Sequence, residues 1–176
     1  EERFLTFNFK IMPYGEKSSE PNADKAKAVR QAVANLIDRE ELATKVYKGT
    51  YTPMYSFIPD GLAGHDDTLK AAYGDGNGKP SSEKAKKTLE AAGVKTPVDL
   101  KLQYNPDHYG QSSADEYAAI KSQLEEGGLF KVDLQSTEWT QYSKDRVVTE
   151  DSDGVYPAYQ LGWFPDYSDP DNYLSP

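Results

Sequence analysis

The most distinctive stretch of this 176-residue chain reads Gly162-Trp163-Phe164-Pro165-Asp166-Tyr167-Ser168-Asp169-Pro170-Asp171-Asn172. The alternating pattern from residue 156 to residue 163 predicts a strand that runs directly into it. Pro and Asp dominate the part that follows, which indicates a loop, because proline lacks a backbone N–H and Asp side chains bond to nearby backbone N–H groups. We therefore expect a polar loop at the end of a strand, where functional side chains often lie.

Outward from this stretch, helices alternate with strands. Period-two patterns predict strands at residues 3–9, 98–104, 130–134 and 156–163, and apolar residues at spacings of three and four predict helices at 25–37, 38–48, 81–93, 113–126 and 139–148. This alternation indicates an α/β fold with a mixed sheet flanked by helices. The length suits a single domain that covers residues 1–176.

Two helix starts carry capping signals. Asp38 is expected to cap the second helix, and Glu41 three residues later completes an Asp-x-x-Glu variant of the capping box. Ser81 is expected to cap the helix that ends at Gly93. Between these helices, residues 50–81 are rich in Gly and Pro and are expected to be irregular.

Composition excludes several classes of function. The net charge is −9 and no cluster of Lys and Arg occurs, so nucleic acid is not an expected partner. The chain has no Cys, which removes disulfides, thiolate zinc sites and cysteine nucleophiles. No stretch of about 18 apolar residues is present to span a membrane.

Metal and enzyme chemistry find little support. The two histidines, His65 and His108, lie in separate predicted loops and are interpreted as surface residues, so no zinc site is expected. Residues 75–80 resemble the start of a calcium loop, but Lys79 and Pro80 stand where an oxygen ligand and Gly are required. No nucleophile elbow, phosphate loop or dinucleotide fingerprint occurs. We predict neither a metal, nor a cofactor, nor an enzyme.

Four segments, in this order, resemble the peptide-, nickel- and opine-binding family of ABC-importer solute-binding proteins (extracellular solute-binding protein family 5, oligopeptide/dipeptide-binding type). They are the Arg-Gln-Ala helix of residues 29–39 with its Asp38-Arg39 step, residues 46–50 followed by Ile58-Pro59-Asp60-Gly61, the Lys-Ala-Lys helix of residues 81–93, and the 162–172 stretch. Ser81 stands where Asp is common in the family. Together the segments span nearly the whole chain.

The resemblance implies a periplasmic-binding-protein-like (type II) lobe. The first residues read as a strand already under way and the last lack a closing element, so residues 1–176 are expected to be the C-terminal lobe of a larger two-lobed protein, truncated at both ends. The implied function is to capture short peptides in a cleft between the lobes for an ABC permease. The implied partners are the missing N-terminal lobe and the permease subunits. A monomer is expected outside the cytoplasm, in the periplasm or lipid-anchored at the cell surface.

Three residues are candidates for ligand binding under this resemblance. Asp166 resembles the carboxylate that receives the α-ammonium of a bound peptide, and a desolvated ammonium requires such a partner. Trp163 is either a wall of the cleft or an ordinary core residue, and Tyr167 either lines the pocket or, as we favour, braces the loop. Asp169, Asp171 and Asn172 are expected to hold the shape of the loop through side-chain hydrogen bonds.

Other functions remain open at this point. The same scaffold carries nickel complexes, opines or sugars, and such a ligand gives Asp166 no ammonium to meet. Asp166 itself could simply cap a turn. From other classes of protein, an acid-dependent hydrolase could use paired carboxylates such as Asp151 and Asp153, and a third reading is an interaction module without a small ligand.

Overall fold

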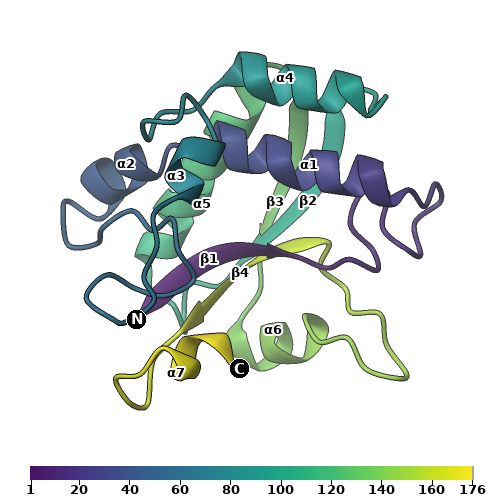
Figure 1. The fold of residues 1–176 in the computed structure, drawn as a ribbon. Coiled ribbons are helices and arrows are strands. Elements are labelled where there is room, and N and C mark those ends of the chain that lie inside the picture. Colours follow the sequence, from purple (N-terminus) through teal and green to yellow (C-terminus); the bar gives the residue numbers. More distant parts are fainter. Residues whose placement is uncertain (176) are drawn as a thin grey trace.

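Figure 1 shows the computed structural model of the chain, which describes residues 1–175. The strands are β1 (Glu2–Phe7), β2 (Val98–Tyr104), β3 (Phe130–Ser136) and β4 (Ala158–Trp163). The helices are α1 (Ala23–Leu36), α2 (Arg39–Glu41), the π-helical turn η1 (Leu42–Val46), α3 (Leu69–Ala72), α4 (Ser82–Ala91), α5 (Ser112–Glu125), α6 (Trp139–Asp145) and α7 (Asp171–Leu174). Each strand and each helix that the sequence predicts is present, with the predicted bounds for β2 and shifted ends elsewhere. The four-residue helices α3 and α7 are additional, and α3 lies in the segment that was expected to be irregular.

The four strands form one mixed sheet in the order β1-β4-β2-β3. β4 is antiparallel to β1 and parallel to β2, and β2 is parallel to β3. The predicted α/β fold with a mixed sheet is confirmed. Because β2, β3 and β4 run in the same direction, the loops after their carboxyl ends meet at one edge of the sheet, which is the usual place for ligands in α/β folds.

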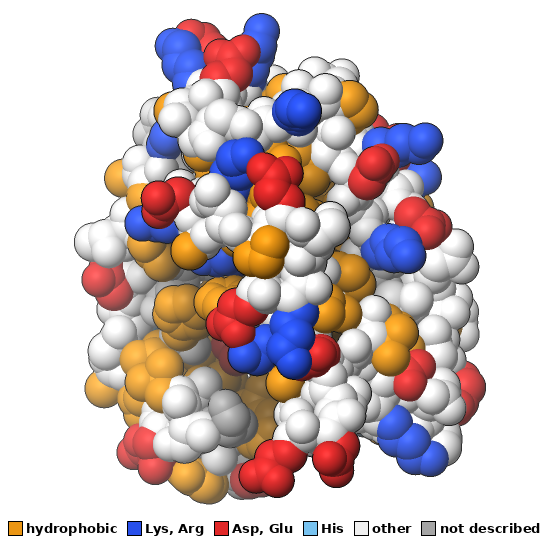
Figure 2. Space-filling model, turned by 90° about the vertical axis from the view of Figure 1, so that its right-hand side faces the viewer, with side chains coloured by type: hydrophobic (Ala, Val, Ile, Leu, Met, Phe, Trp, Pro, Cys, Tyr) orange, Lys and Arg blue, Asp and Glu red, His pale blue; other side chains and the backbone are white. Residues whose placement is uncertain are grey.

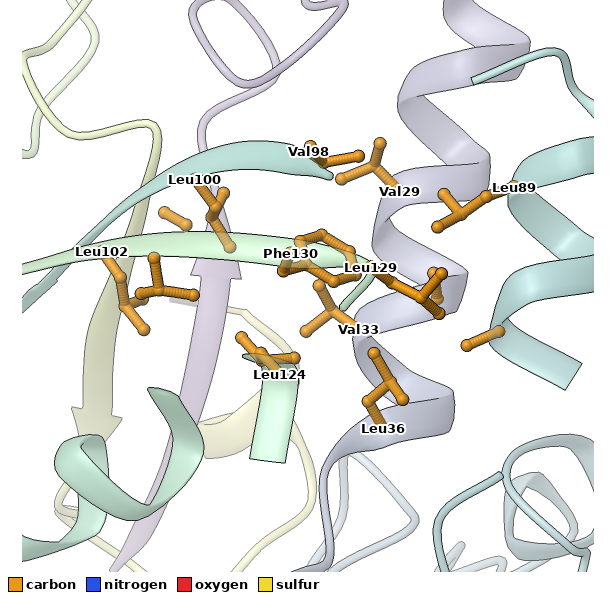
Figure 3. Close-up of a cluster of buried hydrophobic side chains, with 14 of the residues drawn as sticks. Val29, Val33, Leu36, Leu89, Val98, Leu100, Leu102, Leu124, Leu129 and Phe130 are labelled. Atoms are coloured by element: carbon orange, nitrogen blue, oxygen red, sulfur yellow. The ribbon is translucent and has the colours of Figure 1, made fainter. Parts of the chain in front are cut away.

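The core lies where α1, α4 and α5 meet β2 and β3. Figure 3 shows apolar side chains from these elements pointing toward one another, among them Val33 of α1, Leu89 of α4, Leu100 of β2 and Leu124 of α5. These side chains are buried. In Figure 1, α1 and α4 lie above the sheet, and α6 and α7 lie below it. The core therefore occupies the upper half, and the carboxyl ends of the parallel strands point toward α6 and α7.

The corner after α1 differs in part from its prediction. The Asp38 carboxylate accepts the Glu41 N–H at 2.8 Å, so the predicted cap is confirmed. The reciprocal half of the capping box is wrong, because the side-chain carbonyl of Gln123 on α5 accepts the Asp38 N–H at 3.0 Å. Glu41 instead accepts a bond from the Gln123 amide. A tertiary contact has taken the place of the local one.

The second predicted helix is not a regular α-helix. After α2 the chain widens into η1, where the Tyr47 N–H bonds to the Leu42 carbonyl at 3.1 Å. Single π-helical turns of this kind are rare. The turn ends at Lys48 and Gly49, which both have positive φ. The Tyr47 hydroxyl here donates to the Glu116 carboxylate of α5 and accepts a bond from Arg3 of β1.

The face on the right-hand side of Figure 1 carries charges of both signs. Figure 2 shows Lys and Arg interspersed with Asp and Glu across this face, without a basic stripe. Hydrophobic side chains gather around a hollow at the lower left of that view.

Truncation of Leu89 tests the core. Leu89 is fully buried, so we expect Leu89→Ala to lower the free energy of unfolding by about 2–5 kcal/mol through lost apolar burial and the cavity left behind. Urea denaturation followed by circular dichroism measures this loss. Leu69→Ala is the matched control, because Leu69 is 40% exposed and its truncation is expected to cost less than about 1 kcal/mol. Equal losses for the two variants would contradict the assignment of the core.

Candidate ligand-binding site

The candidate site begins where β4 ends, and the local packing explains the residue types there. Gly162 pairs with Arg3, and Trp163 with Glu2, across the antiparallel β1–β4 ladder. A Cβ at Gly162 would lie 2.8 Å from the Glu2 carbonyl oxygen and 3.1 Å from a ring carbon of Tyr109. The Gly162 N–H also donates to the Tyr109 hydroxyl at 3.2 Å. Glycine therefore permits the close approach that fixes the end of β4.

The loop after β4 is held by one buried side chain, Asn172 of α7. Its side-chain carbonyl accepts the indole N–H of Trp163 at 3.0 Å and the backbone N–H of Asp166 at 2.9 Å. Asn172 is only 5% exposed, so both bonds are shielded from competing water. The Asp169 carboxylate accepts the Asp171 N–H at 3.2 Å. The predicted loop-holding roles of Asn172 and Asp169 are confirmed, whereas Asp171 opens α7.

The structure places the three predicted site residues in different environments. Asp166 is exposed, and its backbone is fixed by Asn172 while its carboxylate lies at the surface. Trp163 is half-buried, and its indole N–H is committed to the loop. Tyr167 is 53% exposed. This partial exposure does not decide between the pocket and bracing roles of Tyr167, so both stay predictions.

An aromatic wall that the sequence analysis missed stands beside this loop; we use that name for His108, Tyr109, Trp139 and Phe164. The His108 ring stacks on Trp139, with ring centroids 3.8 Å apart and planes 11° apart. Phe164 and Tyr109 meet His108 edge-on, with centroids 6.3 and 4.9 Å away. Half of Phe164 is exposed. The wall thus offers an exposed apolar surface at Phe164, which precedes Asp166 by two positions in the sequence.

The wall assembles because its members follow three parallel strands. His108 comes after β2, Trp139 after β3 and Phe164 after β4. The buried Asn105 donates to Asp107, whose carboxylate accepts the Trp139 N–H at 3.1 Å and so ties two of the loops together. That N–H bond lowers the pKa of Asp107 below its usual range. The sequence signal was an aromatic residue shortly after each of the three parallel strands. This signal could be interpreted only once the strand order showed that the three strand ends are neighbours.

A cationic side chain borders the wall. Arg146 follows α6, and its buried Nε has no hydrogen-bond partner among residues 1–175. Burial raises the pKa of Tyr109 and of Tyr159, and the nearby charge of Arg146 opposes that rise in both. Arg146 is therefore a half-buried cation near Tyr109 of the aromatic wall and near Tyr159 of β4.

Glu2 lies on the opposite strand, paired with Trp163. Its side chain is buried, and Oε2 has no hydrogen-bond partner within the described residues. Burial raises the pKa of this carboxyl from 4.5 to about 7. The protonated form is thus favoured in the folded state.

Two further requirements, those of a metal site and of a membrane-spanning helix, are not met by the described residues. No group of three or more His, Asp or Glu side chains converges as metal ligands anywhere in residues 1–175. Within the same residues, no helix has the length and apolar character needed to cross a bilayer.

Comparison with known proteins places the chain in a family. Residues 1–176 match the family described as bacterial extracellular solute-binding proteins, family 5 Middle. The chain belongs to this family. Among curated relatives of this solute-binding chain, the oligopeptide-binding protein OppA of Bacillus subtilis (strain 168) is 27% identical over 149 residues, which cover 83% of the chain and 26% of OppA. The resemblance inferred from the four sequence segments is confirmed.

Solved structures share the fold. The dipeptide-binding protein of Pseudoalteromonas sp. SM9913, in complex with Met-Leu, superposes on the solute-binding chain with a TM-score of 0.75 at 24% identity, covering 99% of this chain and 30% of that one. AgaA from A. tumefaciens R10, in complex with agropinic acid, gives a TM-score of 0.71 at 24% identity and covers 98% and 30%. The predicted binding-protein fold is confirmed, and the chain spans about 30% of the length of these proteins.

The loop-holding role of Asn172 can be tested by stability. Asn172→Ala leaves the Trp163 indole N–H and the Asp166 N–H without their acceptor, so we expect the free energy of unfolding to fall by about 1–3 kcal/mol. Urea unfolding followed by tryptophan fluorescence provides the measurement. Asn77→Ala, in an exposed turn, serves as the control and should change stability by less than about 0.5 kcal/mol. A loss no greater than that of the control would show that Asn172 does not carry the loop.

The burial of Glu2 predicts a pH dependence of stability. The pKa of its carboxyl is higher in the folded than in the unfolded state, so the folded state binds more protons between about pH 4.5 and 7. Stability is therefore expected to fall as pH rises through that range and to level off above it. Glu116, whose pKa burial also raises, contributes in the same direction.

We expect Glu2→Gln to flatten this slope in part, measured by urea unfolding at a series of pH values. Glu150→Gln, in an exposed loop, is the control that should leave the slope unchanged. A Glu2→Gln profile parallel to that of the parent protein would contradict the assigned pKa shift.

Proposed function

We propose that the protein carrying this chain is the substrate-binding component of an ABC importer and captures short peptides by their amino terminus. In this proposal the chain is the C-terminal lobe of a two-lobed protein, and ligand lies in the cleft between the lobes. Asp166 receives the α-ammonium group. The observation that carries the proposal is an exposed carboxylate whose backbone is fixed by the buried Asn172.

The chemistry favours an ammonium at Asp166. An ammonium group that leaves water needs a carboxylate partner, since an uncompensated buried charge is strongly destabilising. A rigid loop supplies that carboxylate at a defined position and lowers the entropy that binding costs. Asp166 is exposed in this lobe, so desolvation would come from closure of a second lobe over it.

The surroundings of Asp166 fit the rest of a peptide. The aromatic wall offers apolar surface for side chains, and pockets for small ligands combine such surface with a few placed polar groups. In this proposal the guanidinium of Arg146, a half-buried cation whose charge acts on Tyr109, meets the carboxylate end of a short peptide. Together these groups would recognise a zwitterion with an apolar middle.

Two alternatives have specific observations. AgaA shares the fold and holds agropinic acid, so a non-peptide ligand on this scaffold is the second candidate. The hydrolase alternative is weakened by Asp153, which pairs with Lys17 at 3.3 Å while its carbonyl accepts a bond from Asn8. These contacts support a structural role for Asp153.

The proposal extends to partners and location. The permease subunits of an ABC transporter would take the ligand from the closed protein, and a monomer would suffice for this transfer. The family description places its members outside the cytoplasm. We infer the periplasm or the cell surface for this protein, with a lipid anchor in the latter case.

Replacement of Asp166 tests the proposal directly. Asp166→Asn in the intact protein should weaken binding of a short peptide by about 2–4 kcal/mol, because the substitution leaves the ligand ammonium buried without a charge partner. Isothermal titration calorimetry of a tripeptide series measures the change. N-acetylation of the same peptides should produce a comparable loss in the parent protein and little further loss in the variant.

Asp151→Asn is the matched control, because Asp151 is exposed in another loop. Peptide affinity that survives Asp166→Asn unchanged would reject the ammonium role. Tight binding of acetylated or non-peptide ligands by the parent protein would instead favour the second candidate.

A further inference from the structure

A small cavity lies at the corner between the α1–α2 junction and the irregular segment 50–80. Its lining includes Arg39, Tyr55, Tyr73 and Lys79. The space open to a water-sized sphere is about 10 Å³, which is the volume that one water molecule needs and is too small for a larger ligand. The cavity is far from the site described above in the sequence and shares no residue with it.

Two polar side chains face this cavity with hydrogen-bonding capacity left over. The Tyr55 hydroxyl is buried and has no hydrogen-bond partner within residues 1–175. Such a hydroxyl is rare in native proteins, because an unpaired buried polar group costs about 1–3 kcal/mol. Arg39 lies over the Tyr55 ring, with its guanidinium carbon 5.2 Å from the ring centroid.

Within residues 1–175, the Arg39 guanidinium has no anionic partner of the kind that a half-buried cation usually has. The neighbouring Asp38 carboxylate is occupied as the cap of α2 and as the partner of Lys79, at 3.8 Å. Burial lowers the pKa of Arg39, and the opposing contributions come from two tyrosines, Tyr55 and Tyr73. A guanidinium has five N–H donors, so it retains donors for a neutral acceptor.

We propose that one water molecule is bound in this cavity, where it accepts a hydrogen bond from the Arg39 guanidinium and bridges to the Tyr55 hydroxyl. In this proposal Asp38 caps α2, and Arg39, the next residue, holds the bridging water. The bridge joins α2 to Tyr55, which lies in a part of the chain outside any helix or strand. Buried waters in proteins commonly satisfy polar groups in this way.

A crystal structure of the protein at about 1.5 Å resolution tests the water directly. The expected result is an ordered peak within about 2.7–3.2 Å of both the Tyr55 Oη and a guanidinium nitrogen of Arg39. A dry cavity, a side chain that fills it, or a Tyr55 hydroxyl bonded directly to a protein group would overturn the proposal.

Two variants provide an independent test in solution. Tyr55→Phe removes one partner of the water and is expected to lower the melting temperature by about 2–4 °C, while Tyr167→Phe, at an exposed ring, is the control that should not change it. Arg39→Met combined with Tyr55→Phe should cost less than the sum of the single losses, because both act on one water. A Tyr55→Phe variant at least as stable as the parent protein would contradict the bridge, whether or not Arg39→Met folds.

Discussion

The side-chain carbonyl of Asn172 joins the last strand of the sheet, the loop that follows it and the final helix. It accepts one hydrogen bond from the Trp163 indole and one from the Asp166 backbone, and it does so in a buried environment. Hydrogen bonds to a shielded acceptor are hard to replace, because removal of the acceptor leaves both donors unpaired. This single group therefore anchors the backbone of Asp166 to α7.

The sheet brings further groups to the same place. Three parallel strands end at one edge, and the segments after them bring Trp139 and Phe164 against His108. Across the antiparallel ladder, Gly162 allows Tyr109 and the β1 backbone to approach β4 closely. Backbone geometry, rather than any one motif, therefore assembles the acidic, aromatic and cationic groups of the candidate site.

Much of the fold could be predicted from the sequence because its strands and helices have clear periodicities. The cap at Asp38 and the loop-holding role of Asn172 also followed from local chemistry. The sequence could not show that Gln123, 85 residues away along the chain, would take the Asp38 N–H, nor that the chain would widen into a π-helical turn. Both depend on contacts between distant segments, which local patterns do not record.

The dependence on contacts between distant segments also explains why only part of the candidate site could be predicted from the sequence. Asp166 stood out because it lies within a recognisable motif, whereas the aromatic wall has members in three separate loops and no motif of its own. The role of Tyr167 stays a prediction, because motif membership does not specify what a half-exposed ring contacts. Strand order was the missing information, since it determines which loops become neighbours.

The most direct test of the account is a crystal structure of the intact protein bound to a short peptide with an unmodified amino terminus. The account predicts that the peptide nitrogen lies about 2.7–3.2 Å from an Asp166 carboxylate oxygen, with Asn172 still holding the loop. A structure in which the ammonium meets a different carboxylate while Asp166 faces solvent would contradict it.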